Sequence, residues 1–258
     1  MHSFSFNNVS LSTFGGNITK PPFHTVAKRD KEMVKIYGQN GDEIIDNGTY
    51  NNVTFSMEIA LFPKKVNMTA QALAYAVIDW LAPLQNDYYV YRDTYNPNYF
   101  TRATLTNFPQ VERTLRTLLT ATLEFSRVPF WYSDAGAVEA VATNGRLTLT
   151  NPEKYDAEPV IFFNYTGTAA NNYTLYLYIN NSLLSENKLL LGGVTPSFYL
   201  DGVNKQHYTI QNNQKIYLSN ILPPNLAANS ATAFSARMDG QSVGEDLQMK
   251  VTPNWRRL

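Results

Sequence analysis

The sequence predicts a mainly β protein of two domains, with a single helix in its N-terminal half. Many short runs alternate apolar and polar residues, turn signals such as Asn-Gly separate them, and only residues 70–81 repeat apolar side chains at helical spacing. A chain of 258 residues also has the length of about two ordinary domains.

The N-terminal half opens with strand signals. Phe4 and Phe6 alternate with serine, and residues 33–37 lead into Asn40-Gly41, a dipeptide typical of tight hairpins because both residues tolerate positive φ. The clearest strand is 53–61, in which every odd position is apolar and positions 54, 56 and 58 are polar. We therefore expect a half-buried antiparallel strand with one solvated face.

The predicted helix follows. Leu73 and Val77 recur at helical spacing, Asn67 or Thr69 is placed to cap the N-terminus, and Pro83 ends the segment. We expect its apolar stripe to pack on the sheet rather than to form a groove for a partner. The segment is too short to span a bilayer, so no membrane insertion is expected.

Strands resume after the helix and end at a break in the pattern. The predicted strands are 88–92, 99–105 and 115–125, the last with Leu115, Leu119, Ala121, Leu123 and Phe125 on one face. Proline and glycine interrupt the pattern at 128–136, which predicts domains of residues 1–136 and 137–258.

The second half reads as β throughout. Short strands separated by turn signals predict a sandwich of two sheets. The predicted strands are 146–150, 160–164, 173–179, 188–191, 198–201, 208–211, 215–218 and 247–251. Residues 222–238 are rich in Ala, Asn and Ser and show no clear strand, which leaves one edge of the second sheet undefined.

Composition argues against several function classes. Net charge is zero and no basic stripe appears, which disfavours nucleic-acid readout and binding to anionic membranes. Cysteine is absent, so the fold uses no disulfide and no thiolate metal site.

No motif for catalysis is present either. His2, His24 and His207 are scattered, and the acidic residues near Asp42 and Asp239 do not match a calcium loop, so solvated turns are the better interpretation. Phosphate-binding loops and nucleophile elbows are also missing from the sequence. We therefore predict no catalytic residue, no metal site and no cofactor.

The aromatic residues are the candidate contact residues. One crowded region, expected to be an exposed cluster that meets a subunit or partner, consists of Tyr88, Tyr89, Tyr91, Tyr95 and Tyr99. In the strand 173–179, Tyr176 and Tyr178 alternate with leucines. Either the leucines face the core and the tyrosines contact a sugar or protein, or the strand is buried on both sides.

Several motifs, read in order, resemble the distal tail protein of long-tailed, non-contractile phages nearly end to end. The motifs are Phe4-Ser5-Phe6-Asn7, Ile44-Ile45-Asp46-Asn47-Gly48-Thr49-Tyr50, Asp79-Trp80-Leu81, Leu123-Glu124-Phe125-Ser126-Arg127-Val128-Pro129-Phe130-Trp131-Tyr132, Glu158-Pro159-Val160-Ile161, Leu200-Asp201-Gly202 and Pro253-Asn254-Trp255-Arg256. Residues 222–238 depart from the family, which usually has a glycine and a clearer strand there.

The resemblance implies an N-terminal, β-barrel-like belt domain that closes into a homo-hexameric ring, and a C-terminal galectin-like β-sandwich at the periphery. It implies the tail tube protein, the tail-associated hub protein and receptor-binding proteins as partners, and genome DNA passing through the lumen without specific binding. The implied location is the virion tail tip, assembled in the host cytoplasm. A carbohydrate-binding adhesin or receptor-binding protein is the alternative, and a glycosidase is a third reading.

Overall fold

The computed structural model describes residues 2–22, 25–107, 110–115, 117–166, 172–183, 189–192, 197–218, 223–238 and 242–258. The chain divides into two compact units, Met1–Trp131 with Leu258, and Tyr132–Arg257. Each unit has its own hydrophobic core. The predicted fold class is confirmed, since the described residues form many strands and one α-helix.

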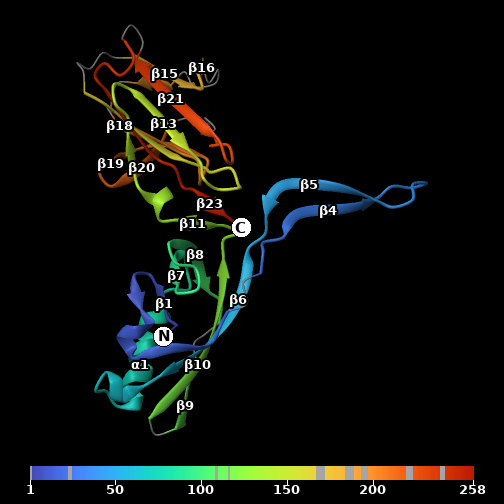
Figure 1. Ribbon diagram of the computed structural model, residues 1–258, viewed down its shortest axis with the longest axis vertical. Coiled ribbons are helices and arrows are strands. Elements are labelled where there is room, and N and C mark those ends of the chain that lie inside the picture. Colours follow the sequence, from blue (N-terminus) through green and yellow to red (C-terminus); the bar gives the residue numbers. More distant parts are fainter. Residues whose placement is uncertain are drawn as a thin grey trace. The chain divides into compact units, whose positions relative to one another are not determined.

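The first unit contains a curled antiparallel sheet with strand order β2-β1-β7-β8-β10-β6-β3, to which β9 adds beside β10 (Figure 1). Its strands are β1 (Phe4–Phe6), β2 (Val9–Ser10), β3 (Gly16–Lys20), β6 (Val53–Leu61), β7 (Tyr89–Asp93), β8 (Tyr99–Leu105), β9 (Val111–Leu115) and β10 (Leu118–Arg127). Strand β10 pairs with β6 over nearly its whole length, while β8 and β9 share its other edge.

Strand β6 confirms the predicted alternation. The side chains of Phe55, Met57 and Ile59 are buried, whereas Thr54 and Ser56 are exposed. The buried side chains join the core of the first unit, together with Phe6, Leu123 and Phe125 from β1 and β10. One face of the sheet is therefore core and the other is wet.

The predicted helix is α1 (Ala70–Leu81), and the Thr69 side chain caps it by accepting from the Ala72 amide at 3.2 Å. Leu73, Val77 and Leu81 are fully buried in the core, which confirms that the apolar stripe packs within the unit. No helix in the described part of the chain has the length and apolarity needed to cross a membrane. Short 3-10 turns precede β3 and α1, namely η1 (Leu11–Phe14) and η2 (Pro63–Lys65).

One predicted strand was wrong. Residues 115–125 do not form a single strand, because the chain reverses after Leu115 and makes a hairpin of β9 and β10. Leu115 ends β9 with 60% of its surface exposed, so it does not share the buried face of Leu119 and Leu123.

Two further strands of the first unit, β4 (Arg29–Lys35) and β5 (Asp42–Tyr50), form a separate two-stranded sheet that appears as a blue ribbon in Figure 1. They pair around the predicted Asn40-Gly41 turn, where Gly41 has φ 92°. This φ is a left-handed value that glycine adopts at little cost.

The second unit is a sandwich of two antiparallel sheets that share one core. The first sheet has the order β12-β22-β14-β18-β19-β20, with β12 (Ala140–Val141), β22 (Leu247–Thr252), β14 (Val160–Tyr165), β18 (Ser197–Asp201), β19 (Gln206–Gln211) and β20 (Gln214–Tyr217). The second has the order β13-β21-β15-β16, with β17 also beside β15; its strands are β13 (Arg146–Thr150), β21 (Ala231–Met238), β15 (Asn172–Ile179), β16 (Ser182–Leu183) and β17 (Leu189–Gly192).

Strand β21 was missed by the sequence analysis. It lies between β13 and β15. Residues 222–238, which were expected to leave one sheet edge undefined, therefore supply an interior strand. Phe234 and Ala236 face the core, and alanine, serine and threonine hold most of the other positions. Such small residues give a weak strand signal, and the two neighbouring strands determine the conformation instead.

The first and last segments of the second unit are hydrogen-bonded to each other. The Ser133 amide in β11 (Trp131–Ser133) donates to the Trp255 carbonyl at 2.9 Å, and the Asn254 amide donates to the Gly136 carbonyl at 2.8 Å. A Cβ on Gly136, within η3 (Ala135–Ala137), would lie 2.3 Å from the Trp255 nitrogen, so only glycine fits. The short strand β23 (Arg256–Arg257) follows.

Burial of Val77 gives a direct test of the helix. We expect Val77→Asp to lower the free energy of unfolding by roughly 3–5 kcal/mol, because it places an unpaired carboxylate in the core. Tyr75→Asp is the matched control, since Tyr75 is exposed on the same helix and its replacement should cost much less. Urea unfolding of both variants measures the difference; equal small losses would mean that α1 is not packed on the sheet.

Candidate functional site

A group of exposed apolar side chains lies on the β4–β5 hairpin. Nearly every residue of both strands is exposed. The exposed apolar side chains are Met33, Val34, Ile36, Tyr37, Ile44 and Ile45, with exposed fractions from 38% upward. The sequence analysis predicted the hairpin but did not recognise that both of its faces are uncovered.

The register places the apolar pairs among charges. Met33 lies opposite Ile44, and the neighbouring pairs on that face are Lys31 with Asp46 and Lys35 with Asp42. The face therefore presents an apolar centre between oppositely charged pairs and is close to neutral overall. On the opposite face, Val34 lies opposite Glu43 and Ile45 lies opposite Glu32, so that face is mixed apolar and acidic.

The base of the hairpin is held by polar and aromatic contacts. The Arg29 Nε donates to both Asp46 oxygens at 2.8 and 2.9 Å, and its Nη1 donates to the Tyr50 hydroxyl at 3.1 Å. The hydrogen bond from Arg29, followed by that from the Gly48 amide, lowers the pKa of Asp46. Tyr50 also makes an edge contact with the Phe130 ring at 5.4 Å. The end of the hairpin near Arg29 and Tyr50, called its root below, is thus held by contacts, whereas the rest of β4 and β5 is exposed.

A buried arginine fastens this root. Arg127, at the end of β10, donates to the carbonyls of Val128, Pro129 and Thr25 at 2.9, 2.8 and 3.1 Å. Its guanidinium also lies 5.4 Å from the centre of the Trp131 ring. Burial lowers the pKa of Arg127 to about 10, and the carboxylate of Asp93 opposes that shift. The side chain joins the segment before β4 to the end of β10.

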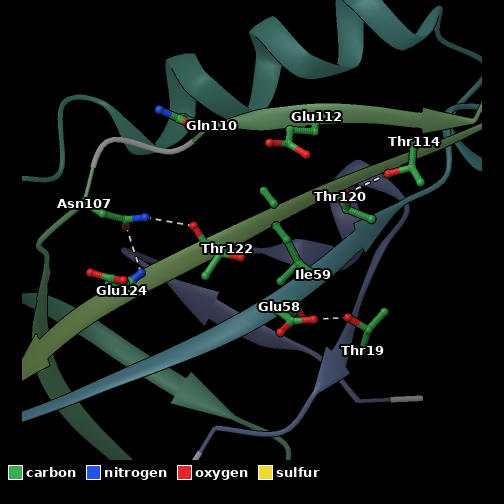
Figure 2. Close-up of a pocket in the computed structure, with 11 residues that line it drawn as sticks. Thr19, Glu58, Ile59, Asn107, Gln110, Glu112, Thr114, Thr120, Thr122 and Glu124 are labelled. Atoms are coloured by element: carbon green, nitrogen blue, oxygen red, sulfur yellow. Dashed lines mark hydrogen bonds between the residues drawn. The ribbon is translucent and has the colours of Figure 1, made fainter.

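The wet face of the sheet forms a shallow polar depression of about 620 Å³, shown in Figure 2. Glu58, Glu112 and Glu124 point into it from β6, β9 and β10. Internal hydrogen bonds fix its polar groups: Asn107 donates to the Thr122 carbonyl at 2.9 Å and accepts from the Glu124 amide at 2.8 Å. Lys20 pairs with Glu58 at 3.2 Å. The described part of the chain holds no group of three or more His, Asp or Glu side chains that could bind a metal ion.

The structure separates the predicted tyrosine cluster. Tyr91 is fully buried among Phe4, Phe55, Phe125 and Trp131, so the prediction that it contacts another molecule is wrong. Desolvation, with the nearby Asp93 carboxylate, raises the pKa of Tyr91 well above its ordinary value. The alternation of side chains in β7 carries Tyr91 inward, which the run of tyrosines in the sequence concealed.

The other four tyrosines are at least partly accessible. The Tyr88 hydroxyl accepts from the Asn52 amide nitrogen at 2.5 Å and the Tyr89 hydroxyl donates to Asn86 at 2.8 Å. Tyr95 stacks on the His2 ring at 4.5 Å, and Tyr99 packs partly against the core. Their role as a contact surface stays a prediction.

Tyr176 and Tyr178 are half-buried on the outer face of the second sheet, while Leu175 and Leu177 face the core. Both tyrosines contact Arg237: its guanidinium lies 4.4 Å from the centre of the Tyr176 ring, and its Nε donates to the Tyr178 hydroxyl at 3.2 Å. Tyr176 and Tyr178 thus both contact Arg237, which the sequence analysis did not predict.

The two described histidines belong to different units. His2 is exposed, His24 lies outside the described residues, and His207 is buried with an edge contact to Phe198 at 5.4 Å. Burial lowers the pKa of His207 to about 4, so its ring is neutral at physiological pH. Asp239 also lies outside the described residues.

An aromatic row on the first sheet of the sandwich was missed. Phe162, Tyr199 and Tyr208 stand side by side, with ring centres 4.8 and 5.1 Å apart. The ammonium of Lys215 lies 4.3 Å from the Tyr208 ring centre and that of Lys250 lies 5.9 Å from Phe162. Tyr199 and Tyr208 stack, whereas Phe162 is tilted against Tyr199. Because the rings contact each other and are flanked by lysines, the row stabilises the sheet face rather than forming a stacking platform.

Comparison with solved structures decides the fold family. The SPP1 Dit (gp 19.1) protein, described as a paradigm of the hub adsorption apparatus in phages infecting Gram-positive bacteria, superposes with a TM-score of 0.64 and 14% identity over all of both chains. The chain has the fold of a phage distal tail protein. A chain of the phage p2 baseplate in its activated conformation gives a TM-score of 0.50 and 8% identity, covering 100% of this chain and 98% of that one.

No protein-family model matches the sequence, and no curated protein does. The distal-tail fold is therefore recognised from the structure, and it confirms the family resemblance found in the sequence motifs at the level of the fold. The two structures named above are described as a hub adsorption protein and a phage baseplate.

Removing Arg127 tests its role at the hairpin root. We expect Arg127→Met to lower the free energy of unfolding by roughly 2–4 kcal/mol, because it leaves carbonyls at Val128, Pro129 and Thr25 without their donor. Hydrogen exchange at residues 25–28 should also accelerate. Arg102→Met, at an exposed position of β8, is the control and should change neither quantity much.

The burial of His207 predicts a pH dependence of the second unit. The unfolded state takes up a proton near the ordinary pKa of 6.5, whereas the folded state does so only near 4. Stability contributed by this group is therefore full above pH 6.5 and is lost as the pH falls toward 4, by roughly 3 kcal/mol. Hydrogen exchange of β18 and β19 should show the loss in the parent, and a His207→Gln variant should lack that component.

Proposed function

We propose that this chain is a structural, non-catalytic component of a phage tail tip: a distal tail protein whose copies close into a hexameric ring. The fold likeness to the SPP1 Dit protein over the whole chain supports the tail-tip role. The uncovered β4–β5 hairpin is the observation that carries the ring, because it needs a partner that the chain does not supply from its own described residues.

A two-stranded ribbon exposed on both faces is at best marginally stable in water and gains stability when a surface covers it. Exposed apolar side chains, such as the cross-strand pair of Met33 and Ile44, are typical of an interaction surface.

A second copy of the chain is the partner that suits a ring. In a ring, one surface of each subunit meets a different surface of the next, and the rotation closes the assembly. A hairpin projecting from one subunit onto its neighbour is such a heterologous contact. The charges on the Met33 face are of both signs, with Lys31 opposite Asp46 and Lys35 opposite Asp42, so docking there does not gather charges of one sign.

In this proposal the ring joins the tail tube protein to the tail-associated hub protein, receptor-binding proteins attach nearby, and the location is the virion tail tip. Genome DNA passes through the lumen without specific binding. The polar depression with Glu58, Glu112 and Glu124 suits a surface that DNA passes, since carboxylates do not hold phosphates.

We also propose that residues 1–136 supply the ring contacts and that residues 137–258 form a peripheral, galectin-like domain. The first unit carries the hairpin, and the second is a sandwich with its own core. The accessible tyrosines Tyr88, Tyr89, Tyr95 and Tyr99 belong to the first unit and are candidates for the same contacts.

The mass of the assembly tests the proposal. We expect light scattering to find about six times 29.2 kDa at high protein concentration or with the tube or hub protein added. The double variant Met33→Ser with Ile44→Ser should reduce assembly at least tenfold while leaving the unfolding free energy of the monomer nearly unchanged, because both residues are exposed.

Val138→Ser is the matched control, since Val138 is 65% exposed but lies outside residues 1–136. It should assemble as the parent does. A parent protein that stays monomeric at every concentration and with both tail partners present would overturn the ring, and assembly unaffected by the double variant would overturn the role of the hairpin.

A further inference from the structure

We infer that the outer face of the second sheet in the sandwich carries a binding site for an oxyanion, that is, a phosphate or carboxylate group. The site is a shallow depression of about 690 Å³ lined by Thr143, Asn144, Arg146, Arg237, Ser242 and Val243. This inference concerns the second unit and does not depend on ring formation.

Strand register brings the two arginines to one face. Arg146 of β13 lies directly opposite Ser235 of β21, and Arg237 is two residues further along β21. Side chains two residues apart on a strand point to the same face, and diagonal neighbours lie within reach of long side chains. Ser235 between them is small, so both guanidinium groups can reach a ligand in the depression.

Arg237 is oriented by its neighbours on β15. The Tyr176 ring lies against its guanidinium at 4.4 Å, and the Tyr178 hydroxyl accepts from Nε at 3.2 Å. Such contacts restrict the rotamers of a long side chain before a ligand arrives, which reduces the entropy lost on binding. The function of the two tyrosines is therefore to position Arg237, not to stack on a sugar.

The charge and chemistry of the lining favour an anion. Two guanidinium groups on one face repel each other, and a shared oxyanion relieves that repulsion through charge-assisted hydrogen bonds. The neutral side chains of Thr143, Asn144 and Ser242 add donors at the rim. Both charged side chains of the lining are arginines. Beside them, the Glu245 carboxylate accepts from the Ser242 amide at 3.0 Å.

The turns around the depression are rigid. Gly145 and Gly244 pack so closely that a Cβ on Gly145 would lie 2.4 Å from the Gly244 Cα. The Ala236 amide donates to the Gly145 carbonyl and the Gly244 amide donates to the Ala236 carbonyl, both at 3.0 Å. Both turns are thereby tied to β21, the strand that carries Arg237, so the lining has a fixed shape.

Three sugars that share a ring test the site. The intact protein is titrated with glucose 6-phosphate, glucuronate and glucose, and amide chemical shifts are followed by NMR. We expect saturable shifts at Asn144 and Ser242 with at least one of the two anionic sugars, weakening as salt is added, and none with glucose. The tighter of the anionic sugars identifies phosphate or carboxylate as the preferred group.

Variants separate the site from general charge effects. Arg146→Gln and Arg237→Gln should each weaken binding at least tenfold, and Tyr178→Phe should weaken it severalfold without changing the charge. Lys154→Gln is the control, because it removes the same charge from an exposed position of the second unit outside the lining. Arg146 is itself exposed, so its replacement leaves the fold intact.

Three results would overturn the inference. They are the absence of binding by both anionic sugars, binding of glucose as tight as that of its charged relatives, and an equal loss in the Lys154→Gln control.

Discussion

The first unit depends on one strand pairing, that of β10 with β6. The register runs from Leu119 opposite Leu61 to Arg127 opposite Val53 without interruption. Because side chains alternate along both strands, this pairing builds the core on one face and the polar depression on the other. A slip of one residue would exchange the two faces, so the alternation in β6 fixes the register.

The same two strands extend into the hairpin root. Strand β6 continues from β5, and β10 ends at Arg127, whose guanidinium binds the carbonyl of Thr25 before β4. A buried charge is expensive unless hydrogen bonds and a partner compensate it. For Arg127, three backbone carbonyls, the Trp131 ring and the Asp93 carboxylate compensate the desolvation of the guanidinium. This compensated charge lies at the base of the exposed β4–β5 hairpin.

Features encoded by local pattern were predictable from the sequence. Strand β6, helix α1 with its Thr69 cap and the turn at Gly41 each depend on a few adjacent residues. Features decided by distant partners were not. Strand β21 is ordered by β13 and β15 despite its weak pattern, and Tyr91 is drawn inward by the pairing of β7.

The two proposed binding surfaces, the β4–β5 hairpin and the depression with Arg146 and Arg237, were the least predictable from the sequence. That Met33 and Ile44 are uncovered follows from the absence of any described element over the hairpin, which a sequence does not display. Likewise, Arg146 and Arg237 are 91 positions apart and share one face of the sheet only because β13 pairs with β21. Sequence reasoning identified Tyr176 and Tyr178 but not the arginine that they hold.

The motifs that carried the family resemblance turn out to hold the fold together. Glu158 accepts hydrogen bonds from Lys205 and Arg256, and the Asn254 side chain donates to its carbonyl at 2.9 Å. A Cβ on Gly202 would lie 2.5 Å from the Pro159 carbonyl oxygen. These residues specify how the sandwich closes on itself, so the motifs identify a fold, and function has to be argued from the surfaces that the fold leaves uncovered.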